Sequence, residues 1–372
     1  MSSDPKVRVL YLEPFNGGSH AAFTRILTAG VDVQWTTLTL PGRHWKWRMH
    51  GAAVRFAQDP KLMTPGAYDV VLASSFTDLS ALVALAPALR DVPIILYFHE
   101  NQLAYPLQAE VRRERDNHFG MIQMISSLVA TRCVFNSDWN RESFLTEAAT
   151  LLRRLPDAVP KGWIEAVRAK SEILPVPLDL PTLPDTLLGE SETARAQGPV
   201  ILWNHRWEFD KNPEAFFAAL RVLIDDGVPF RVAVCGQRYR RAPSVFESAR
   251  AWLGDRVVHW GYAESRAEYE AVLASAQIAV STADHEFFGI SMLEATHFGA
   301  YPLVPDRLSY PALFPQAYRY SEGTLVERLT ALCRTWCAGD ALRADRRALT
   351  APYGEDLLSR YETLLRGLGS SG

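Results

Sequence analysis

The sequence predicts an α/β protein made of two doubly wound, Rossmann-like domains. Short apolar runs alternate with helical patterns, polar residues follow many of these runs, and a proline-rich stretch divides the chain near its middle. At 372 residues the chain is also too long for one average domain, since domains usually hold about 100 to 200 residues. We therefore expect two domains that face each other across a cleft, with a hinge between them.

The first domain, residues 1–178, begins with an apolar run at 7–12, a turn that contains Gly17 and Gly18, and a helical pattern at 21–27. A strand, a glycine turn and a helix in this order are typical of a doubly wound sheet, which binds ligands at the carboxyl ends of its strands. The turn lacks the G-x-G-x-x-G pattern, so it could equally be a connection that binds nothing. Further strands are predicted at 31–40, 70–73, 94–98 and 131–136.

Polar residues gather where these predicted strands end. They are Ser74-Ser75, His99-Glu100-Asn101-Gln102 and Asn136-Ser137. Because parallel strands point their carboxyl ends to one edge of a sheet, these residues are site candidates by position. A single histidine at a strand end is more often a structural residue than a catalyst, and the same holds for His20.

A linker is predicted at residues 179–198, because prolines stiffen its start and the polar stretch that follows cannot build a core. The second domain, residues 199–350, repeats the alternation of strands and helices, and residues 351–372 form a C-terminal helix and tail. Its strands are predicted at 200–203, 230–235, 257–260, 278–281 and 301–305, and its helices at 213–225, 243–253, 266–274 and 324–336.

Composition excludes several classes of protein. A net charge of −3 argues against a protein that coats nucleic acid without specificity. No apolar run is long enough to span a membrane, and the start of the chain lacks a secretory pattern, so we expect a soluble, cytoplasmic protein without a membrane partner. The four cysteines form no C-x-x-C pair, which favours buried thiols over a disulfide framework or a zinc site.

The stretch 281–299 carries the strongest chemical signal. It passes from a predicted strand through a polar turn and Gly289 into a helical pattern, and the first N–H groups of a helix form a ready anion site. Glu286 and Glu294 bracket this helix start. A lone carboxylate here would be a cap or a solvated charge, whereas two of them can hold a polyol whose phosphates lie at the helix end. The pattern indicates a nucleotide sugar.

A second charged turn follows the first strand of the second domain. It places Arg206 and Lys211 just before the helix predicted to start at Pro213. The planar guanidinium of arginine and the point charge of lysine suit a diphosphate. The alternative is an ion pair of either residue with Glu208 or Asp210. We favour the phosphate role, because both charged turns end strands of one predicted sheet and should lie together.

Metal chemistry has little support in the sequence. The chain contains no Asp-x-Asp, H-x-x-x-H or H-E-x-x-H motif. We therefore expect no metal site and no cofactor, with Arg206, Lys211 and helix dipoles neutralising the phosphates. A nucleophile elbow and a P-loop are also missing, which argues against hydrolase and NTPase functions.

Basic and aromatic residues alternate at 43–48, and Arg55 follows. Such a segment can bind phosphates and stack on unpaired bases. Other basic clusters occur at 112–115, 153–154 and 238–241. Each one alone is more typical of a solvated face, but four of them in an acidic chain support nucleic acid as a partner.

The segment from His285 to Glu294 resembles the E-x7-E signature of the retaining GT-B glycosyltransferases of family 4, and Arg206 with Lys211 resembles the diphosphate pair of that family. A narrower resemblance, to the tRNA-queuosine α-mannosyltransferases, runs from about Val9 to Pro315. The segments that carry it are EPFNGGSH, LPGRHWKWR, YFHENQLAYP, FNSDWNRESFL, WNHRWEFDKNPE and ADHEFFGISMLEA.

This resemblance implies that mannose moves from GDP-mannose, with retention, to the cyclopentene hydroxyl of queuosine at the wobble position of a tRNA of the tRNA-Asp type. The implied catalytic residues are His99, Arg206, Lys211 and Glu286. The implied donor-binding residues are Gly17, Gly18, Arg206, Lys211, Tyr262, His285, Glu286, Phe287, Phe288, Gly289 and Glu294. The implied acceptor-binding residues are Ser19, His20, His44, Trp45, Trp47, Arg48, Glu100, Asn101 and Gln102. Phe288 departs from the family pattern, in which many members have proline.

Two alternatives remain open at this point. One is a family 4 enzyme with another nucleotide sugar, or with a glycan or small molecule as acceptor. The other is a non-catalytic protein that binds nucleotide sugars or RNA, although such a protein would not need all the implied catalytic residues. We expect Arg206→Ala or Lys211→Ala to abolish transfer without loss of the fold, and Trp45→Ala and Trp47→Ala to impair transfer to tRNA more than donor hydrolysis.

Overall fold

The structure is a computed structural model of the chain, and it describes residues 6–106, 117–183, 192–239, 242–340, 342 and 344–370. The chain forms two compact units: unit 1, Met1–Asp179 with Tyr353–Gly372, and unit 2, Leu180–Pro352. Some sequence predictions lie outside the described residues: the basic cluster at 112–115, Arg240, Arg241 and the middle of the predicted linker, 184–191.

Unit 1 is built on a six-stranded sheet in which neighbouring strands are parallel. Its strands are β1 (Arg8–Asn16), β2 (Gln34–Pro41), β3 (Val70–Ser74), β4 (Ile94–Phe98), β5 (Arg132–Phe135) and β6 (Ser171–Ile173). The strand order β2-β1-β3-β4-β5-β6 changes direction at β1, which pairs with β2 on one side and with β3 on the other. In doubly wound sheets, ligands bind beside such a switch point.

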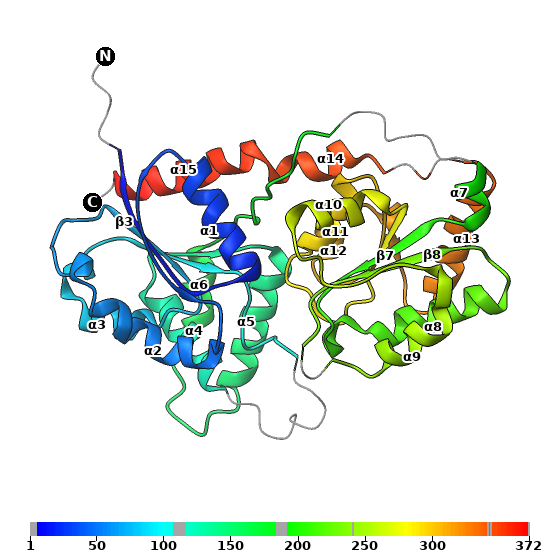
Figure 1. The fold of residues 1–372 in the computed structure, drawn as a ribbon. Helices are drawn as coiled ribbons and strands as arrows, with labels where there is room; N and C mark the ends of the chain where they lie inside the picture. Colours follow the sequence, from blue (N-terminus) through cyan, green and yellow to red (C-terminus); the bar gives the residue numbers. More distant parts are fainter. Residues whose placement is uncertain are drawn as a thin grey trace, which may run out of the picture. The chain divides into compact units, whose positions relative to one another are not determined.

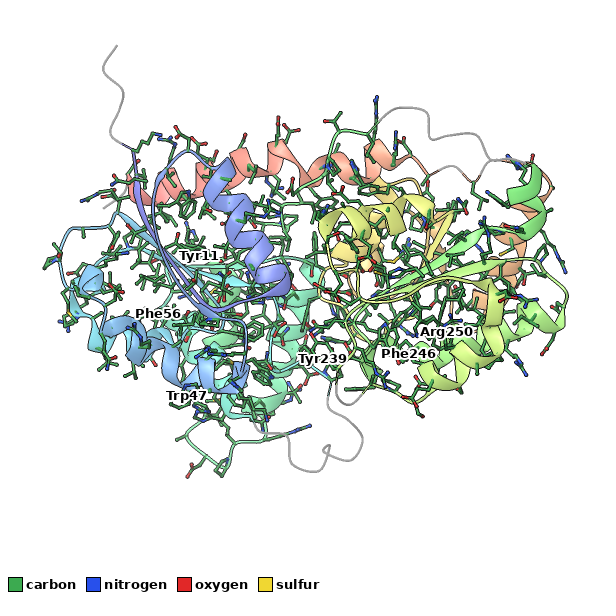
Figure 2. The ribbon with its side chains drawn as sticks, in the orientation of Figure 1. Tyr11, Trp47, Phe56, Tyr239, Phe246 and Arg250 are labelled. Atoms are coloured by element: carbon green, nitrogen blue, oxygen red, sulfur yellow. The ribbon has the colours of Figure 1, made fainter. Side chains whose placement is uncertain are left out.

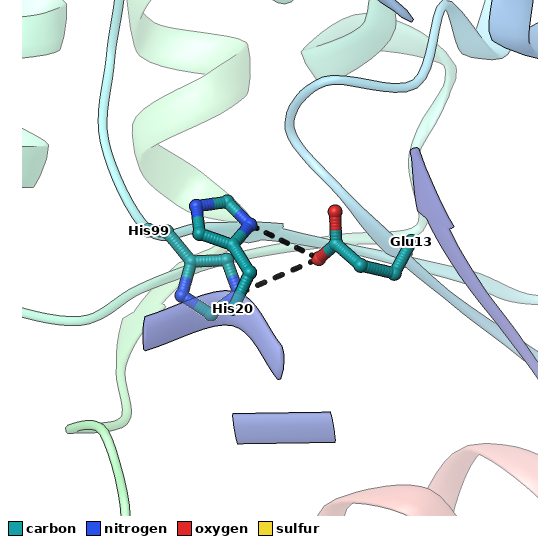
Figure 3. Close-up of side chains that lie close together, drawn as sticks. All are labelled: Glu13, His20 and His99. Atoms are coloured by element: carbon teal, nitrogen blue, oxygen red, sulfur yellow. Dashed lines mark hydrogen bonds and ion pairs between the residues drawn. The ribbon is translucent and has the colours of Figure 1, made fainter. Parts of the chain in front are cut away.

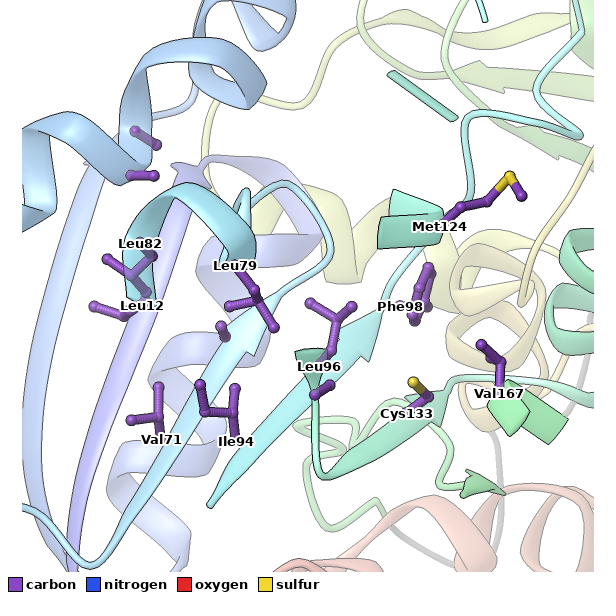
Figure 4. Packing of buried hydrophobic residues seen from close by; sticks show 14 of the residues in the cluster. Leu12, Val71, Leu79, Leu82, Ile94, Leu96, Phe98, Met124, Cys133 and Val167 are labelled. Carbon is purple, nitrogen blue, oxygen red and sulfur yellow. The ribbon is translucent and has the colours of Figure 1, made fainter. Parts of the chain in front are cut away.

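Helices cover both faces of this sheet (Figure 1). They are α1 (Gly18–Gly30), α2 (Trp45–Ala57), α3 (Leu79–Leu85), α4 (His118–Val129), α5 (Asp138–Leu152), α6 (Trp163–Ala169) and α15 (Glu355–Gly369). Figure 4 shows part of the core, where Val71, Ile94 and Leu96 of the strands lie near Leu79 and Leu82 of α3. Strands β3 and β4 are buried along their whole length, because a parallel sheet has helices on both faces.

Unit 2 has a second six-stranded sheet whose neighbouring strands are also parallel. Its strands are β7 (Val200–Asn204), β8 (Arg231–Cys235), β9 (Val257–Gly261), β10 (Ile278–Val280), β11 (Tyr301–Pro305) and β12 (Arg319–Tyr320). The strand order β12-β11-β10-β7-β8-β9 changes direction at β7, so β7 and β10 flank the switch point. The turns that follow these two strands carry the charged residues predicted from the sequence.

The helices of unit 2 follow the predicted pattern with small shifts at their ends. They are α7 (Glu192–Gln197), α8 (Pro213–Asp225), α9 (Val245–Leu253), α10 (Arg266–Ser275), α11 (Ile290–His297), α12 (Tyr310–Leu313), α13 (Leu325–Cys337) and α14 (Arg346–Thr350). The start of α8 shows why it begins where predicted: the Asn212 side chain accepts a hydrogen bond from the Ala215 N–H, and Pro213 occupies the first turn.

For two segments the structure adds to the sequence prediction. Residues 192–197, assigned to the linker, form α7, and the Arg195 side chain donates to the carbonyl oxygen of Trp336 in α13 over 3.0 Å. Part of the predicted linker is thus helical, because a helix that packs on a neighbour does not need an apolar core of its own. The C-terminal helix α15 belongs to unit 1, where the Tyr361 hydroxyl donates to the carbonyl oxygen of Pro175 over 2.7 Å.

Candidate functional site

The turns after β7 and β10 are joined by hydrogen bonds. The backbone N–H groups of Asp284 and His285 donate to the carbonyl oxygen of Asp210 over 2.9 and 3.2 Å. The Thr282 hydroxyl donates to the carbonyl oxygens of Lys211 and Asn212, both over 2.9 Å. The prediction that the two charged turns lie together is confirmed, and the switch point of unit 2 is where they meet.

Lys211 is the centre of this pair of turns. Its ammonium donates to the carbonyl oxygen of His285 over 2.6 Å and lies 3.3 Å from Glu286 Oε2 and 3.4 Å from Asp210 Oδ2. Only 8% of the lysine side chain is exposed. Because a buried ion pair that loses one partner leaves an uncompensated charge, the structure leads us to expect that Lys211→Ala destabilises the fold, unlike the expectation from the sequence.

Arg206 differs from Lys211 in its exposure. Its guanidinium lies 3.1 Å from Glu208 Oε2, and 46% of its side chain is exposed. The ion pairs that the sequence offered as an alternative to phosphate binding therefore both form, Arg206 with Glu208 and Lys211 with Asp210. An exposed arginine can exchange its carboxylate for a phosphate at small cost, since surface ion pairs contribute little.

The electrostatics of these turns favour an ionised Glu286 among neutral histidines. Burial alone would raise the pKa of Glu286, but the Lys211 cation and the N–H of Phe288 hold it below its ordinary value. Burial and Lys211 lower the pKa of His205 to about 3 and that of His285 to about 4. Both imidazoles are neutral at physiological pH, so Lys211 supplies the positive charge beside Glu286.

Helix α11 starts at the end of the second charged turn. Gly289 precedes it with φ 116°, a backbone conformation that side-chain-bearing residues rarely adopt. A Cβ atom at this position would lie 3.0 Å from Leu313 and 3.2 Å from Tyr310. Glycine is thus required for α11 to begin where its first N–H groups can receive an anion.

Glu294 lies on α11 and has two partners in unit 2. Its Oε2 accepts a hydrogen bond from the Tyr269 hydroxyl over 2.8 Å, and its Oε1 lies 3.0 Å from Arg266 Nη1. The Asn204 amide donates to the same tyrosine hydroxyl over 2.8 Å. Sequence reasoning missed Tyr269 and Arg266, because they lie on α10 and no motif connects them to Glu294.

The aromatic residues of the predicted donor site fall into two groups. Phe287 and Phe288 are buried, and the carbonyl oxygen of Phe288 accepts a hydrogen bond from the Ser309 hydroxyl over 2.6 Å. Tyr262, which follows β9, is 59% exposed. The phenylalanines therefore shape the turn from inside, whereas the tyrosine ring is available to stack on a ligand.

In unit 1 the predicted His20 and His99 lie together with a residue that sequence reasoning missed. Figure 3 shows both rings beside the carboxylate of Glu13, which is fully buried near the end of β1. The distance from Glu13 Oε2 is 3.1 Å to His20 Nδ1 and 3.9 Å to His99 Nε2. A glutamate inside an apolar strand is a signal that could have been used, since a buried glutamate almost always has a partner.

The three side chains offer ligand atoms within 4.8 Å of one another, close enough for a metal ion. However, Glu13 already accepts hydrogen bonds from the Phe15 N–H over 2.8 Å and the Ser74 hydroxyl over 3.1 Å, as well as from His20. Four acceptor positions of a carboxylate are nearly filled in this way. We interpret the group as a hydrogen-bonded cluster.

The loop after His99 has both buried and accessible parts. Asn101 is fully buried, and its side chain donates to Asn140 Oδ1 over 2.9 Å and accepts from the Ala104 N–H over 2.7 Å. Asn101 therefore supports the loop through these hydrogen bonds, and its role in acceptor binding stays a prediction. Gln102 and Glu100 are half-buried and hydrogen-bonded to each other over 3.0 Å.

Two predicted acceptor segments are brought together by glycines. A Cβ atom on Gly42 would lie 2.6 Å from the Cα atom of Gly17, so the turns after β1 and β2 can approach only because both residues lack side chains. Ser19, in the first turn of α1, and His44, just before α2, are exposed. His44 itself has φ 54° and caps the start of α2. Such strained backbone is found most often at functional positions.

The two predicted tryptophans of α2 point in different directions. Trp45 packs against Phe119 and Phe76, with ring centroids 5.1 and 6.2 Å apart, in a small apolar cluster. Trp47 is 64% exposed and lies over Gly51 on the surface of α2 (Figure 2). Only Trp47 is therefore placed to contact a partner, while Trp45 holds α2 on unit 1.

The basic side chains near Trp47 are also exposed. Arg43 and Lys46 are exposed, and Arg48 is half-buried with its Nε donating to the carbonyl oxygen of Pro41 over 3.2 Å. Arg55 is exposed further along α2. We call the exposed residues Arg43, Lys46, Trp47 and Arg55 the α2 face.

Among the described residues, no helix is long and apolar enough to cross a lipid bilayer.

Two parallel Rossmann-like sheets, the second with charged turns at its switch point, define the GT-B class of glycosyltransferases. Residues 188–328 match the family model described as glycosyl transferases group 1, and residues 8–178 match the tRNA-queuosine alpha-mannosyltransferase N-terminal model. The tRNA-queuosine alpha-mannosyltransferase of Drosophila melanogaster is 36% identical over 88% of this chain and 88% of its own length. The chain belongs to the tRNA-queuosine α-mannosyltransferase family, as its segments predicted.

More distant relatives agree on the class. A GDP-mannose:cellobiosyl-diphosphopolyprenol alpha-mannosyltransferase of Xanthomonas oryzae is 26% identical over 36% of this chain and 35% of its own length. Sucrose-phosphate synthase from Thermosynechococcus elongatus has a TM-score of 0.67 at 15% identity, over 98% of this chain and 100% of that one. A UDP-forming trehalose-phosphate synthase from Burkholderia xenovorans has a TM-score of 0.62 at 12% identity, over 97% and 99%. The predicted α/β fold class is confirmed.

Proposed function

We propose that this enzyme transfers mannose from GDP-mannose to the cyclopentene hydroxyl of queuosine at the wobble position of a tRNA of the tRNA-Asp type, with retention of the α configuration. The observation that carries the proposal is the joined pair of turns in unit 2, where Lys211 and Glu286 lie 3.3 Å apart at the switch point. The similarity to the Drosophila relative supports the acceptor, and the similarity to the Xanthomonas relative supports the donor.

The donor phosphates belong at the two charged turns. Arg206 and Lys211 stabilise the charge that develops on the diphosphate as the glycosidic bond breaks, the term that is usually largest in such catalysis. Both cations are side chains of the protein, so neither has to be taken up from solvent as an ion. We expect Glu294 to bind the ribose and Glu286 the sugar hydroxyls, while the exposed ring of Tyr262 stacks on the base.

Retention follows from a substitution on one face of the sugar. The bond between C1 and the phosphate oxygen breaks with its electron pair on the phosphate, and the acceptor oxygen bonds to C1 from the same side. The leaving phosphate takes the acceptor proton, so GDP and the mannosylated nucleoside are the products. His99 at the end of β4 is the residue of unit 1 that we assign to the reacting sugar.

The tRNA is bound by unit 1 in this proposal. The α2 face presents three cations and the exposed Trp47 ring on one helix and the turn before it. Cations neutralise phosphates and an aromatic ring stacks on an unpaired base, which is how anticodon-loop nucleotides are generally recognised. The side chains that we assign to the acceptor nucleoside belong to the same unit and are Ser19, His44, Glu100 and Gln102.

We further propose that transfer needs no metal ion and takes place in the cytoplasm. Lys211 and Arg206 supply the positive charge that a divalent cation would otherwise provide. Transfer should therefore proceed at an unchanged rate when the protein is treated with EDTA. A rate that falls with EDTA and recovers with added Mg²⁺ or Mn²⁺ would contradict this part of the proposal.

The decisive experiment uses labelled GDP-mannose with tRNA from cells that make queuosine and from cells that do not. Label should appear in queuosine-containing tRNA alone, as an α-linked mannose released by α-mannosidase. Label in both tRNA samples would show another nucleoside as acceptor. Label in neither sample, with a folded protein that binds GDP-mannose, would refute the tRNA acceptor.

A further inference from the structure

Glu13 is a charged residue in the interior of unit 1. It lies near the carboxyl end of β1, next to the switch point between β1 and β3, and its side chain has no exposed surface. Burying a carboxylate is costly unless hydrogen bonds replace the lost water. We therefore expect a buried carboxylate beside two histidines to have a role beyond packing.

The two oxygens of Glu13 have different partners. Oε1 accepts the Phe15 N–H over 2.8 Å and the Ser74 hydroxyl over 3.1 Å, and both of these donors are neutral. Oε2 faces the two imidazoles and the Tyr11 hydroxyl, which donates over 3.4 Å. Because a carboxylate only accepts hydrogen bonds, the 3.1 Å contact requires that His20 carries a proton on Nδ1. The first oxygen fixes the carboxylate, and the second acts on the histidines.

The two imidazoles compete for Oε2. Their ring centroids are 4.1 Å apart, and both side chains are buried. His20 makes the hydrogen bond, whereas Nε2 of His99 is buried without a hydrogen-bond partner among the described residues and lies 3.9 Å from the same oxygen. Two cations at this distance in a buried site would repel each other strongly. Only one of the two rings can hold a positive charge.

We propose that Glu13 is a positioning residue for the transfer reaction: it holds His20 as the charged member of a buried pair and thereby keeps His99 neutral, with its Nε2 edge facing the carboxylate. This inference rests on the proposed function, in which His99 faces the reacting sugar. A neutral His99 can accept or donate a hydrogen bond at a sugar hydroxyl without adding a second cation to the site.

The electrostatics agree with this geometry. Burial alone would lower the pKa of His20, but the charge and the hydrogen bond of Glu13 raise it above its ordinary value. Burial and the neighbouring His20 lower the pKa of His99 well below its ordinary value. Two other groups bear on the pair: Glu100, whose charge favours the His20 cation, and Tyr97, whose ring lies 4.7 Å from that of His99.

The test compares Glu13→Gln with the wild-type protein. Glutamine keeps the shape and can still accept a hydrogen bond, but it removes the charge that holds the His20 cation. We expect kcat for mannosyl transfer to fall by about 10² or more, as for loss of a preorganised hydrogen-bonding group at the reacting centre, with KM for GDP-mannose unchanged. Ser127→Ala is the matched control, because Ser127 is a fully buried polar residue of unit 1 whose hydroxyl donates to the carbonyl oxygen of Met124 over 2.6 Å, outside the Glu13 cluster.

A second readout does not depend on activity. Nitrogen-15 NMR of labelled histidine at neutral pH should show a cationic ring for His20 and a neutral ring for His99, with signals assigned from His20→Gln and His99→Gln. In Glu13→Gln both rings should be neutral. A neutral His20 in the wild-type protein, or unchanged kcat in a folded Glu13→Gln variant, would overturn the proposal. So would a stoichiometric metal ion found by mass spectrometry in the wild-type protein.

The two proposals fail in different ways. If the wild-type enzyme transfers no mannose to tRNA but the NMR spectra show the expected charge distribution, the proposed acceptor is wrong and the cluster stands. If transfer occurs and Glu13→Gln unfolds, the less severe Glu13→Asp variant decides the matter. The aspartate side chain is one methylene shorter, so its carboxylate should lie further from His20 and kcat should fall in a folded protein. Full activity of Glu13→Asp with a neutral His20 would count against the role of Glu13.

Discussion

The charged turns of unit 2 and the α2 face of unit 1 differ in how exposed their cations are. In unit 2, Lys211 is buried between Glu286 and Asp210, whereas in unit 1 Lys46 and Arg43 are exposed. A paired, buried cation is held in place before the ligand arrives, which favours one small ligand in one orientation. Exposed cations attract a large polyanion over a distance and contribute little to its exact placement. The difference fits a nucleotide sugar in unit 2 and a nucleic acid on unit 1.

The largest contrast within unit 2 is between Lys211 and Arg206. Lys211→Met should destabilise the protein by about 3 to 5 kcal/mol, because Asp210 and Glu286 lose their buried partner. Arg206→Ala should leave the free energy of unfolding within about 0.5 kcal/mol, as is usual for exposed sites, and slow transfer by roughly 10² to 10³. Urea titrations and single-turnover transfer assays separate the two effects. A Lys211→Met protein as stable as the wild type would contradict this difference between Lys211 and Arg206.

The two tryptophans of α2 should separate stability from tRNA binding. Trp45→Ala is expected to destabilise unit 1 by about 2 kcal/mol, less than a fully buried tryptophan, since the side chain is only half-buried. Trp47→Ala should keep its stability and weaken tRNA binding by about 1 to 3 kcal/mol through the loss of one stacked base. Donor hydrolysis should not change in Trp47→Ala. Thermal melts and tRNA filter binding are the measurements, and equal effects of both variants in both assays would place the two rings in one structural role.

Acid should act on the two sites with opposite sign. The pKa of His205 in unit 2 is lowered to about 3 by burial and Lys211, so below the ordinary value of about 6.5 the unfolded chain binds the proton first and stability falls. One such histidine costs about 1.4 kcal/mol per pH unit in this window. In unit 1 the pKa of His20 is raised, so its contribution is present below the ordinary value and is lost as the pH rises through the raised one.

Urea titrations between neutral pH and pH about 5 should show this difference when the histidines are replaced one at a time. His205→Gln should reduce the loss of stability in acid. His20→Gln should make that loss larger, because the favourable protonation in unit 1 disappears. If the free energy of unfolding changes with pH in the same way in the wild type and in His205→Gln, this histidine is not kept neutral in the folded protein.

The smallest effect concerns the salt dependence of tRNA binding. Lys46→Ala and Arg43→Ala should each lower the slope of log affinity against log salt by about 0.7 to 0.9, the value for one phosphate contact. Arg238→Ala is the control, because Arg238 is paired with Glu247 over 2.7 Å in unit 2. An equal change of slope in Arg238→Ala would show that the assignment of tRNA binding to the α2 face of unit 1 is wrong.

Much of the fold could be predicted because apolar runs in a parallel sheet are buried on both faces and therefore stand out in the sequence. Strands β3 and β4 match their runs closely. Strands β6 and β12 have only 3 and 2 residues, too few to form a recognisable pattern. Helix α2 was predicted only as a basic aromatic segment, because its start depends on the left-handed backbone of His44, which no periodicity reveals.

The site was predictable where a motif exists and unpredictable where a contact joins separate elements. The signature around Glu286 and the Arg206–Lys211 turn pointed to the two turns that meet at the switch point of unit 2. No spacing in the sequence shows that Lys211 is buried against Glu286, since that contact depends on β7 and β10 being neighbours. Glu13 was missed for the same reason: its partners come from α1, β3 and the end of β4.

The return of α15 to unit 1 means that unit 2 is an insertion within the chain of unit 1. Leu357, Tyr361 and Leu365 of α15 are buried there, so a fragment that stops at residue 179 would lose a helix from its own core. Unit 2, in contrast, is one continuous piece, Leu180–Pro352. A deletion that joins residue 179 to residue 353 is therefore the fragment expected to fold as unit 1, and the proposed donor and acceptor sites can be studied separately by this route.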